Sequence, residues 1–147
     1  MERAANSGKK TGLTPQLLDI RKVEDIAPAF ADATSQHVDV LVVSVDALTQ
    51  KNRSFITQLA AGHGLPAIYV SKEYVDAGGL IAYGPSYADL YRRAATYVDK
   101  ILRGASPSSL PVEQTTKFEL IINLKAARAI GLQVPMTLMV RADEVIE

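Results

Sequence analysis

The sequence predicts an α/β fold built on a doubly wound, mainly parallel sheet. Segments with strand character alternate with segments of helical periodicity, and the connections between them are short. The apolar run at 38–45 is nearly continuous and rich in β-branched residues, which is typical of a strand buried on both faces of a parallel sheet. Residues 87–103 repeat apolar side chains at helical spacing over several turns. These patterns together favour a single α/β unit.

The amino-terminal half is expected to alternate strands and helices. Residues 17–20 are a short strand candidate, and residues 23–33 carry apolar side chains at helical spacing after an acidic start. The strong strand at 38–45 follows. A helix at 49–61 and a strand at 66–70 complete this half, separated by glycines that end the helix.

The carboxy-terminal half continues the alternation. Its expected elements are a short helix at 72–76, a strand at 80–83, the long helix at 87–103, a Ser/Pro linker at 105–111, a strand at 118–122, a helix at 124–130 and a short helical tail from 135. Ser86 and Asp89 resemble a capping box at the start of the long helix, and Gly104 closes its far end.

Composition excludes several classes of function. The 147 residues include 16 basic and 16 acidic side chains, so the chain lacks the clustered positive charge of a nucleic-acid surface. The absence of cysteine excludes disulfides, thiolate metal sites and a cysteine nucleophile. No apolar run approaches the roughly 20 residues that span a bilayer. Residues 1–12 are expected to be a disordered lead-in without a signal-peptide core, so the chain, if complete, is expected to be cytoplasmic.

Ligands of parallel α/β sheets bind at the carboxyl ends of the strands, so the residues that follow each strand are the candidate site. A carboxylate there could hold an ammonium or hydroxyl group of a ligand, and a tyrosine offers an apolar wall with a polar tip. Capping explains Asp46 equally well, core packing explains Tyr87, and solvation explains Glu73. The candidate ligand-binding residues are Ser44, Asp46, Glu73, Tyr83, Ser86 and Tyr87.

Catalysis is not expected. His37 and His63 are isolated, and neither has the histidine or glutamate spacing that holds a metal ion. No phosphate loop, nucleophile elbow or dinucleotide fingerprint follows a predicted strand. The sequence therefore predicts a binding domain that is not an enzyme and uses no metal or cofactor.

The second half of the chain resembles a known family. The segments GGLIAYGPSYADLYRRAATYVDKILRG (78–104), LPVEQTTKFELIINLKAARAIGL (110–132) and RADEVIE (141–147) resemble the carboxy-terminal part of ABC-transporter substrate-binding proteins of the tryptophan/tyrosine-binding-like group. The upstream segments VDVLVVSVDAL (38–48) and LPAIYV (65–70) fit the same register.

The resemblance implies a lobe of a type I periplasmic binding protein. Such receptors close a small solute, such as an amino acid, between two Rossmann-like lobes and deliver it to an ABC permease. Their location would be periplasmic or membrane-anchored. By position, Asp46 matches the aspartate after the central strand of the second lobe, while Tyr83, Ser86 and Tyr87 match the segment that enters the last long helix and faces the cleft. The identity of the solute stays open.

The resemblance also implies a missing partner for part of the chain. A whole receptor is about twice this length, so residues 13–147 would be its carboxy-terminal part, with 79–104 crossing over to an absent first lobe. The apolar stripe of the long helix would then lack its usual cover, and we expect two chains to pair as a homodimer, with exchange of segments as one route. The alternative function is a non-catalytic oligomerisation or sensor domain that kept the fold and lost the ligand cleft.

Overall fold

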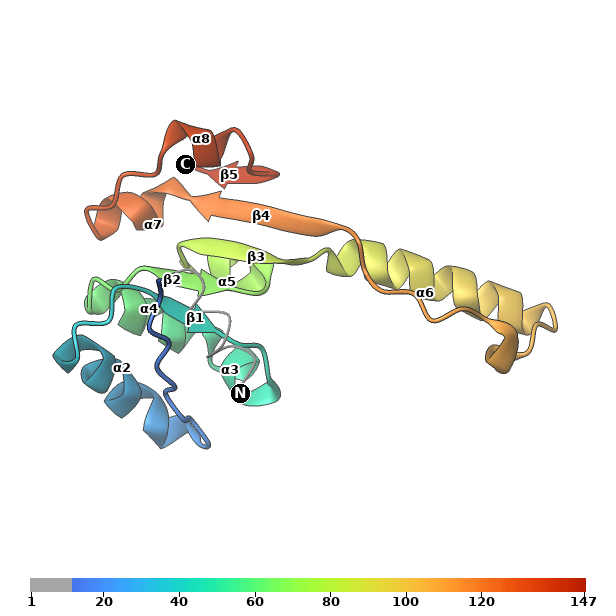
Figure 1. Cartoon of the computed structure of the whole chain (residues 1–147), viewed down its shortest axis with the longest axis horizontal. Helices are drawn as coiled ribbons and strands as arrows, with labels where there is room; N and C mark the ends of the chain where they lie inside the picture. Colours follow the sequence, from blue (N-terminus) through green and yellow to red (C-terminus); the bar gives the residue numbers. More distant parts are fainter. Residues whose placement is uncertain (1–11) are drawn as a thin grey trace.

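The computed structural model describes residues 12–147, which form a five-stranded mixed sheet with helices packed against it (Figure 1). The sheet order is β1-β2-β3-β4-β5, and only the β3–β4 pair is antiparallel. The strands are β1 (Leu41–Val43), β2 (Ala67–Tyr69), β3 (Ile81–Pro85), β4 (Phe118–Asn123) and β5 (Glu144–Ile146). The predicted α/β class with a mainly parallel sheet is confirmed. The lead-in predicted at 1–12 lies, apart from Gly12, outside the described residues.

The helices follow the predicted periodicity closely. They are η1 (Val23–Asp25), α2 (Ile26–Ser35), α3 (Ala47–Lys51), α4 (Arg53–Gly62), α5 (Lys72–Asp76), α6 (Tyr87–Leu102), η2 (Pro107–Ser109), α7 (Leu124–Ala129) and α8 (Met136–Met139). The single helix expected at 49–61 is two helices, because Asn52 leaves helical geometry and serves as the end of α3 and the start of α4.

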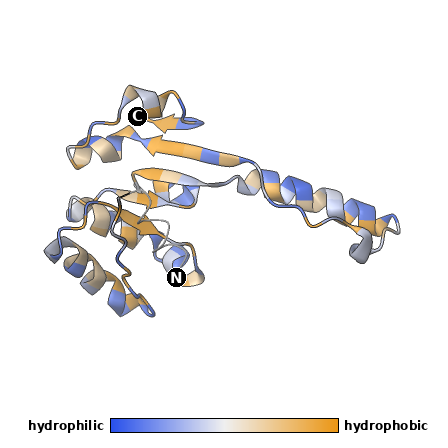
Figure 2. Ribbon diagram, in the orientation of Figure 1, coloured by the Kyte–Doolittle hydropathy of each residue, from blue (hydrophilic) through white to orange (hydrophobic). Residues whose placement is uncertain are grey.

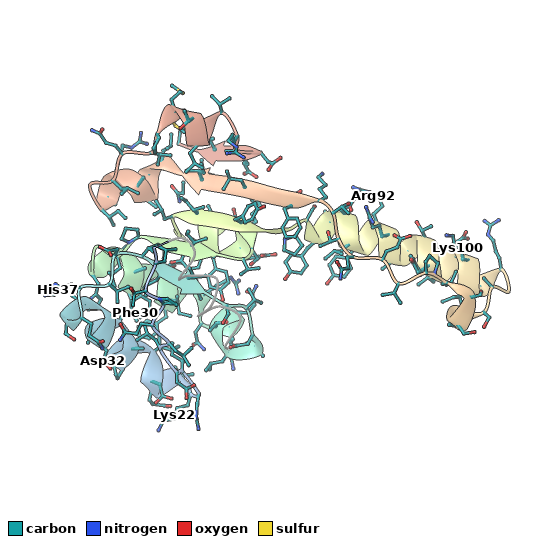
Figure 3. All side chains as sticks on the ribbon, in the orientation of Figure 1. Lys22, Phe30, Asp32, His37, Arg92 and Lys100 are labelled. Carbon is teal, nitrogen blue, oxygen red and sulfur yellow. The ribbon has the colours of Figure 1, made fainter. Side chains whose placement is uncertain are left out.

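The main core lies between α2, α4 and one face of the sheet. Ile26 and Phe30 of α2 and Ile56 of α4 are almost fully buried against Tyr69 of β2. Phe30 points toward the sheet in Figure 3, whereas Asp32 of the same helix points away from it. The apolar strands and inner helix faces stand out in Figure 2. Burial of these side chains from water provides the main stabilisation of the fold.

The strand predicted at 38–45 is present in part, but the prediction that it is buried on both faces is wrong. β1 covers only Leu41–Val43 and lies at the edge of the sheet, where β2 is its only strand neighbour among the described residues. Leu41 faces the core, but Val42 on the other face is 75% exposed. A continuous apolar run predicts a strand without indicating whether the strand is central or at an edge, and this run lies at an edge.

Two further expectations are wrong at the ends of the described chain. Residues 17–20 form no strand, because they have no ladder partner, although Leu18 and Ile20 pack against the core. The carboxy-terminal tail is not only helical. After the four-residue helix α8, β5 adds a parallel strand beside β4, with Ile122 next to Val145.

Helix α6 projects from the end of the sheet as an arm, and the chain returns beside it to β4 (Figure 1). The cap predicted at Ser86 is present, since the Asp89 amide donates to Ser86 Oγ at 3.4 Å. The reciprocal half of the capping box is absent, because the Ser86 amide donates to the Lys117 carbonyl and the Asp89 carboxylate binds Arg93. None of the sixteen residues of α6 is buried. The arm is therefore held by its contacts with the returning segment rather than by the core.

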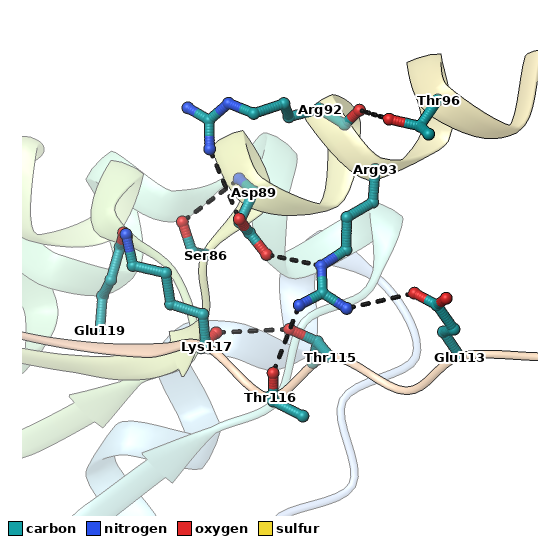
Figure 4. A network of polar contacts seen from close by, with 10 residues as sticks. All are labelled: Ser86, Asp89, Arg92, Arg93, Thr96, Glu113, Thr115, Thr116, Lys117 and Glu119. Carbon is teal, nitrogen blue, oxygen red and sulfur yellow. Dashed lines mark hydrogen bonds and ion pairs between the residues drawn. The ribbon is translucent and has the colours of Figure 1, made fainter. Parts of the chain in front are cut away.

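Polar contacts tie the returning segment to α6 (Figure 4). The Arg93 guanidinium contacts Asp89 at 2.9 Å within the helix and reaches Glu113 at 3.3 Å and Thr116 at 3.4 Å across it. Nearer the tip, Tyr97 Oη donates to the Pro111 carbonyl at 2.7 Å. These bonds cover one side of α6 and leave its other side free of the returning segment.

Candidate functional site

A pocket of about 210 Å³ lies where β2 and β3 end and where α5 and α6 begin. The carboxyl ends of parallel strands meet at one edge of a sheet, so side chains from distant segments converge there. Ala82, Gly84 and Ile121 supply apolar parts of the wall. Its polar and aromatic lining consists of Ser71, Lys72, Glu73, Tyr87 and Glu119.

Ser71 is the most unusual group in this pocket. It lies two residues after the end of β2, is only 5% exposed, and its Oγ atom has no hydrogen-bond partner among the described residues. A buried polar atom without a partner costs roughly 1–3 kcal/mol. The hydroxyl of Ser71 is therefore an unsatisfied polar group at the wall of the pocket.

The charge of the pocket is biased toward negative. Glu73 and Glu119 both line it, and Glu119 has Lys117 Nζ at 3.8 Å. The positive charge of Lys72 is engaged by Glu144 at 2.7 Å and Asp76 at 3.1 Å. The hydrogen bond from Lys72 Nζ to Glu144 is the main reason that the pKa of Lys72 is raised above its ordinary value. A ligand with an ammonium group fits this arrangement better than an anion.

Two of the six predicted binding residues meet at this pocket. Glu73 comes from the first turn of α5 and Tyr87 from the first turn of α6. The half-exposed Tyr87 ring offers an apolar surface beside the carboxylate of Glu73. Their part in ligand binding stays a prediction, and the pocket shows how they could act together.

Asp46 and Ser44 lie outside the lining of this pocket and form the capping turn of α3. Asp46 Oδ1 accepts from the Thr49 amide at 2.8 Å, and Thr49 Oγ1 accepts in return from the Asp46 amide at 3.0 Å. The Ser44 carbonyl also accepts a bond from Thr49 Oγ1 at 3.0 Å. The structure thus gives Asp46 the capping role that its position allows, and a role in binding stays a prediction.

The remaining two candidates also lie outside the lining of the pocket. Tyr83 is on the opposite face of β3 from Ala82 and Gly84, is 57% exposed, and stacks on Phe118 with ring centroids 5.7 Å apart. Ser86 is buried as the cap of α6. Binding by these side chains stays a prediction that this geometry does not favour.

The sequence analysis missed other polar groups. Glu119, which is partly exposed, lines the pocket from β4. Gln50 Oε1 and Tyr74 Oη are buried without hydrogen-bond partners among the described residues. Burial is also the main cause that raises the pKa of Tyr74. The sequence does offer one indication of Ser71 and Tyr74, namely their position after the predicted strand at 66–70. Ser71 is the next residue, and Tyr74 lies three residues further on.

The capping role of Asp46 leads to a stability prediction. We expect Asp46→Ala to lower the free energy of unfolding by about 1 kcal/mol, because the Thr49 amide loses its acceptor. Asp46→Asn, which keeps a capping oxygen, should stay close to the unchanged protein in urea denaturation. Equal losses in both variants would contradict the capping role.

The described residues contain neither a candidate metal cluster nor a candidate membrane span. Within residues 12–147, no three histidine, aspartate or glutamate side chains are grouped so that they could hold a metal ion. Over the same residues, no helix is long and apolar enough to cross a membrane.

A family model matches nearly the whole chain. The model of the ABC transporter substrate binding protein family matches residues 1–146. A tyrosine-binding protein of Clostridioides difficile is 28% identical over 96 residues, which are 65% of this chain and 28% of that protein.

Solved structures show the same fold. A conserved domain protein from Vibrio cholerae superposes with a TM-score of 0.88 and 26% identity, over 99% of this chain and 49% of that one. An ABC domain from Streptococcus pneumoniae in complex with L-Trp superposes with a TM-score of 0.86 and 24% identity, over 99% of this chain and 50% of that one. The chain thus spans about half the length of these structures. It belongs to the ABC transporter substrate binding protein family.

Proposed function

We propose that this chain is a solute-binding lobe of an ABC importer and that it binds a small solute with an ammonium group, such as an amino acid. Its family membership supports solute binding as the general activity. The tyrosine-binding relative and the structural neighbour in complex with L-Trp support amino acids as the solute class.

The observation that carries the proposal is the unpartnered, buried hydroxyl of Ser71 inside a pocket lined by carboxylates. A solute ammonium would lie near Glu73 and Glu119, and the Ser71 hydroxyl would bind a polar atom of the solute. The ring of Tyr87 would cover an apolar part of the solute. Binding would thus satisfy a buried group that the free protein leaves without a partner.

The small size of the pocket supports a two-lobe arrangement. Ligand pockets usually enclose about 300–1,000 Å³, whereas this pocket encloses about 210 Å³. We propose that residues 13–147 are the carboxy-terminal part of a type I periplasmic-binding-protein fold. In a receptor of twice the length, 79–104 would cross to the first lobe, which would supply the other wall of the cleft.

The remaining parts of the proposal follow from the family. The chain would act without catalysis, would deliver its solute to an ABC permease, and would work in the periplasm or attached to a membrane. An association module that has lost solute binding is the alternative, and the exposed side of α6 is the feature that favours it.

Thermal unfolding in the presence of a panel of amino acids and small organic acids tests the proposal. A solute at a hundred times its Kd should stabilise the protein by about 2.7 kcal/mol. We expect a shift with amino acids and a smaller one or none with acids that lack an ammonium group. A folded chain that shifts with no amino acid would contradict solute binding and favour the association module.

Ser71→Ala separates binding from stability. Because the variant removes an unpartnered buried hydroxyl, we expect its unfolding free energy without solute to stay the same or to rise. Its affinity for the stabilising amino acid should fall about tenfold, since a lost hydrogen bond of roughly 1.4 kcal/mol corresponds to that factor. Ser54→Ala, at an exposed position of α4 outside the lining of the pocket, is the matched control and should bind normally. Unchanged affinity in Ser71→Ala would exclude this hydroxyl from the site.

A further inference from the structure

Lys72 is the only basic residue in the lining of the pocket at the ends of β2 and β3, among the residues that the structure describes. Its Nζ atom lies 2.7 Å from Glu144 Oε1 and 3.1 Å from Asp76 Oδ1. Neither of these two acidic residues lines the pocket. Lys72 therefore belongs to the pocket, but its positive charge is paired with groups beyond the lining.

The two carboxylates that hold Lys72 come from different elements. Asp76 lies four residues further along α5, on the same side of the helix as Lys72. Glu144 lies in β5 and pairs with Ile121 of β4, so the two side chains point to the same face of the sheet. Val75 of α5 packs against Ile121 on that face. Lys72 thus reaches from α5 to the last strand of the sheet, beside a wall of the pocket.

The charge of the lining depends on where the Lys72 ammonium is held. Glu73 and Glu119 are the acidic residues of the lining, and Glu119 already has Lys117 Nζ at 3.8 Å. A lysine side chain is long and flexible. If its ammonium turned toward Glu73 and Glu119, two positive charges would balance two negative ones, and a solute ammonium would have to compete with Lys72 for a carboxylate.

We propose that Glu144 and Asp76 are positioning residues that set the specificity of the pocket, because they hold the Lys72 ammonium away from the carboxylates that receive the solute. Neither residue contacts the solute in this arrangement. The inference rests on the proposed function, from which it takes the ammonium-bearing solute, and it adds how the preference for that solute is set.

The exposure of the network suits a role in selection better than one in folding. The side chains of Lys72, Asp76 and Glu144 are 42%, 51% and 46% exposed. Ion pairs at such exposed positions contribute little to stability. Removal of the two acidic charges should therefore leave the protein folded, which circular dichroism checks, and an effect on binding can be measured separately.

The double variant Glu144→Gln/Asp76→Asn tests the proposal, since it removes both charges and keeps the size of both side chains. Titration calorimetry compares the affinities for L-tyrosine and for 3-(4-hydroxyphenyl)propionate, which has the same skeleton without the ammonium group. We expect the ratio of the two affinities to fall about tenfold in the double variant. An unchanged ratio in a folded double variant would overturn the proposal.

Addition of Lys72→Gln to the double variant tests whether the released ammonium is the cause. The triple variant has no ammonium that could enter the pocket, so most of the preference for tyrosine should return. A triple variant that stays as unselective as the double variant would show that Lys72 is not the group through which Glu144 and Asp76 act, and would overturn the proposal.

Asp19→Asn/Asp32→Asn is the control for net charge. It removes the same two negative charges from exposed positions outside the lining, and Asp32 points away from the sheet in Figure 3. The preference for tyrosine should stay the same in this variant. An equal fall in both double variants would assign the effect to net charge and contradict the positioning role.

A nuclear magnetic resonance titration of Lys72 tests the hold without any solute. The hydrogen bond to Glu144 is the main cause that raises the pKa of Lys72, so this pKa should fall toward the ordinary lysine value in Glu144→Gln. An unchanged pKa would contradict the hold. An unchanged chain that binds tyrosine no better than the deaminated acid would contradict the proposed function itself, whereas a preference that survives in the double variant overturns only this inference.

Discussion

Replacing Gly84 with alanine is expected to destabilise this protein strongly. A Cβ atom at this position would lie 1.8 Å from the Val70 carbonyl oxygen and 2.8 Å from its carbon. These are backbone atoms, so no side-chain rotation relieves the clash. Gly84 also pairs with Glu119 in the β3–β4 ladder, so β3 can move away from Val70 only by disturbing that ladder. We expect a loss of about 3 kcal/mol or more in urea denaturation.

A second glycine provides a matched control for this prediction. Gly62 lies in the last turn of α4 at negative φ, and an added Cβ there meets no atom within 4 Å. Gly62→Ala should therefore be neutral or should stabilise the protein by up to about 1 kcal/mol. Equal effects of the two substitutions would show that β3 does not approach β2 as closely as described.

Tyr69→Ala is expected to have the other large effect. The Tyr69 ring is 1% exposed, lies in the main core and stacks on Tyr74 with ring centroids 4.8 Å apart. Removing a buried aromatic side chain leaves a cavity and costs about 3–5 kcal/mol. Small domains are stable by only about 5–15 kcal/mol, so this variant should be marginally folded at room temperature. Thermal denaturation followed by circular dichroism measures the loss.

Tyr83→Ala shows whether the effect of Tyr69→Ala comes from burial. Tyr83 is in the neighbouring strand but is 57% exposed, with its ring against the exposed Phe118. Its loss should cost about 1 kcal/mol, the size of an aromatic pair at a surface. If Tyr83→Ala destabilised the protein as strongly as Tyr69→Ala, the assignment of the core face of the sheet would be wrong.

The sequence best predicts the elements whose formation depends on residues close by in the chain. The helix expected at 72–76 coincides with α5, and the one expected at 87–103 ends within a residue of α6. Apolar spacing and capping residues determine both, and these are local properties. The strand β5 and the irregular course of 17–20 depend instead on whether a distant segment offers a hydrogen-bond ladder, which spacing along the chain does not reveal.

The residues of the candidate site likewise divide into those that local sequence predicts and those that depend on distant segments. Glu73 and Tyr87 were predictable because they follow strands whose direction in a parallel sheet is known in advance. Glu119 was not, because it stands at the start of β4 and reaches the same edge only because β4 runs antiparallel to β3. Asp46 fits two roles on sequence grounds, and only the hydrogen bonds to Thr49 show which of them it has in this structure.

Because β3 and β4 pair in antiparallel, the arm between them (residues 86–117) is an insertion within a β-hairpin. The chain leaves the sheet at Pro85 and re-enters it at Phe118, and these two residues are direct partners in the ladder. The Ser86 amide closes the base of the insertion with a bond to the Lys117 carbonyl at 3.0 Å. Residues 86–117 therefore act as one long hairpin loop, whose closure entropy grows only slowly with its length. A change in the length of the arm beyond Tyr87 would therefore leave the register of the sheet the same, because that register is set by the β3–β4 ladder outside the insertion.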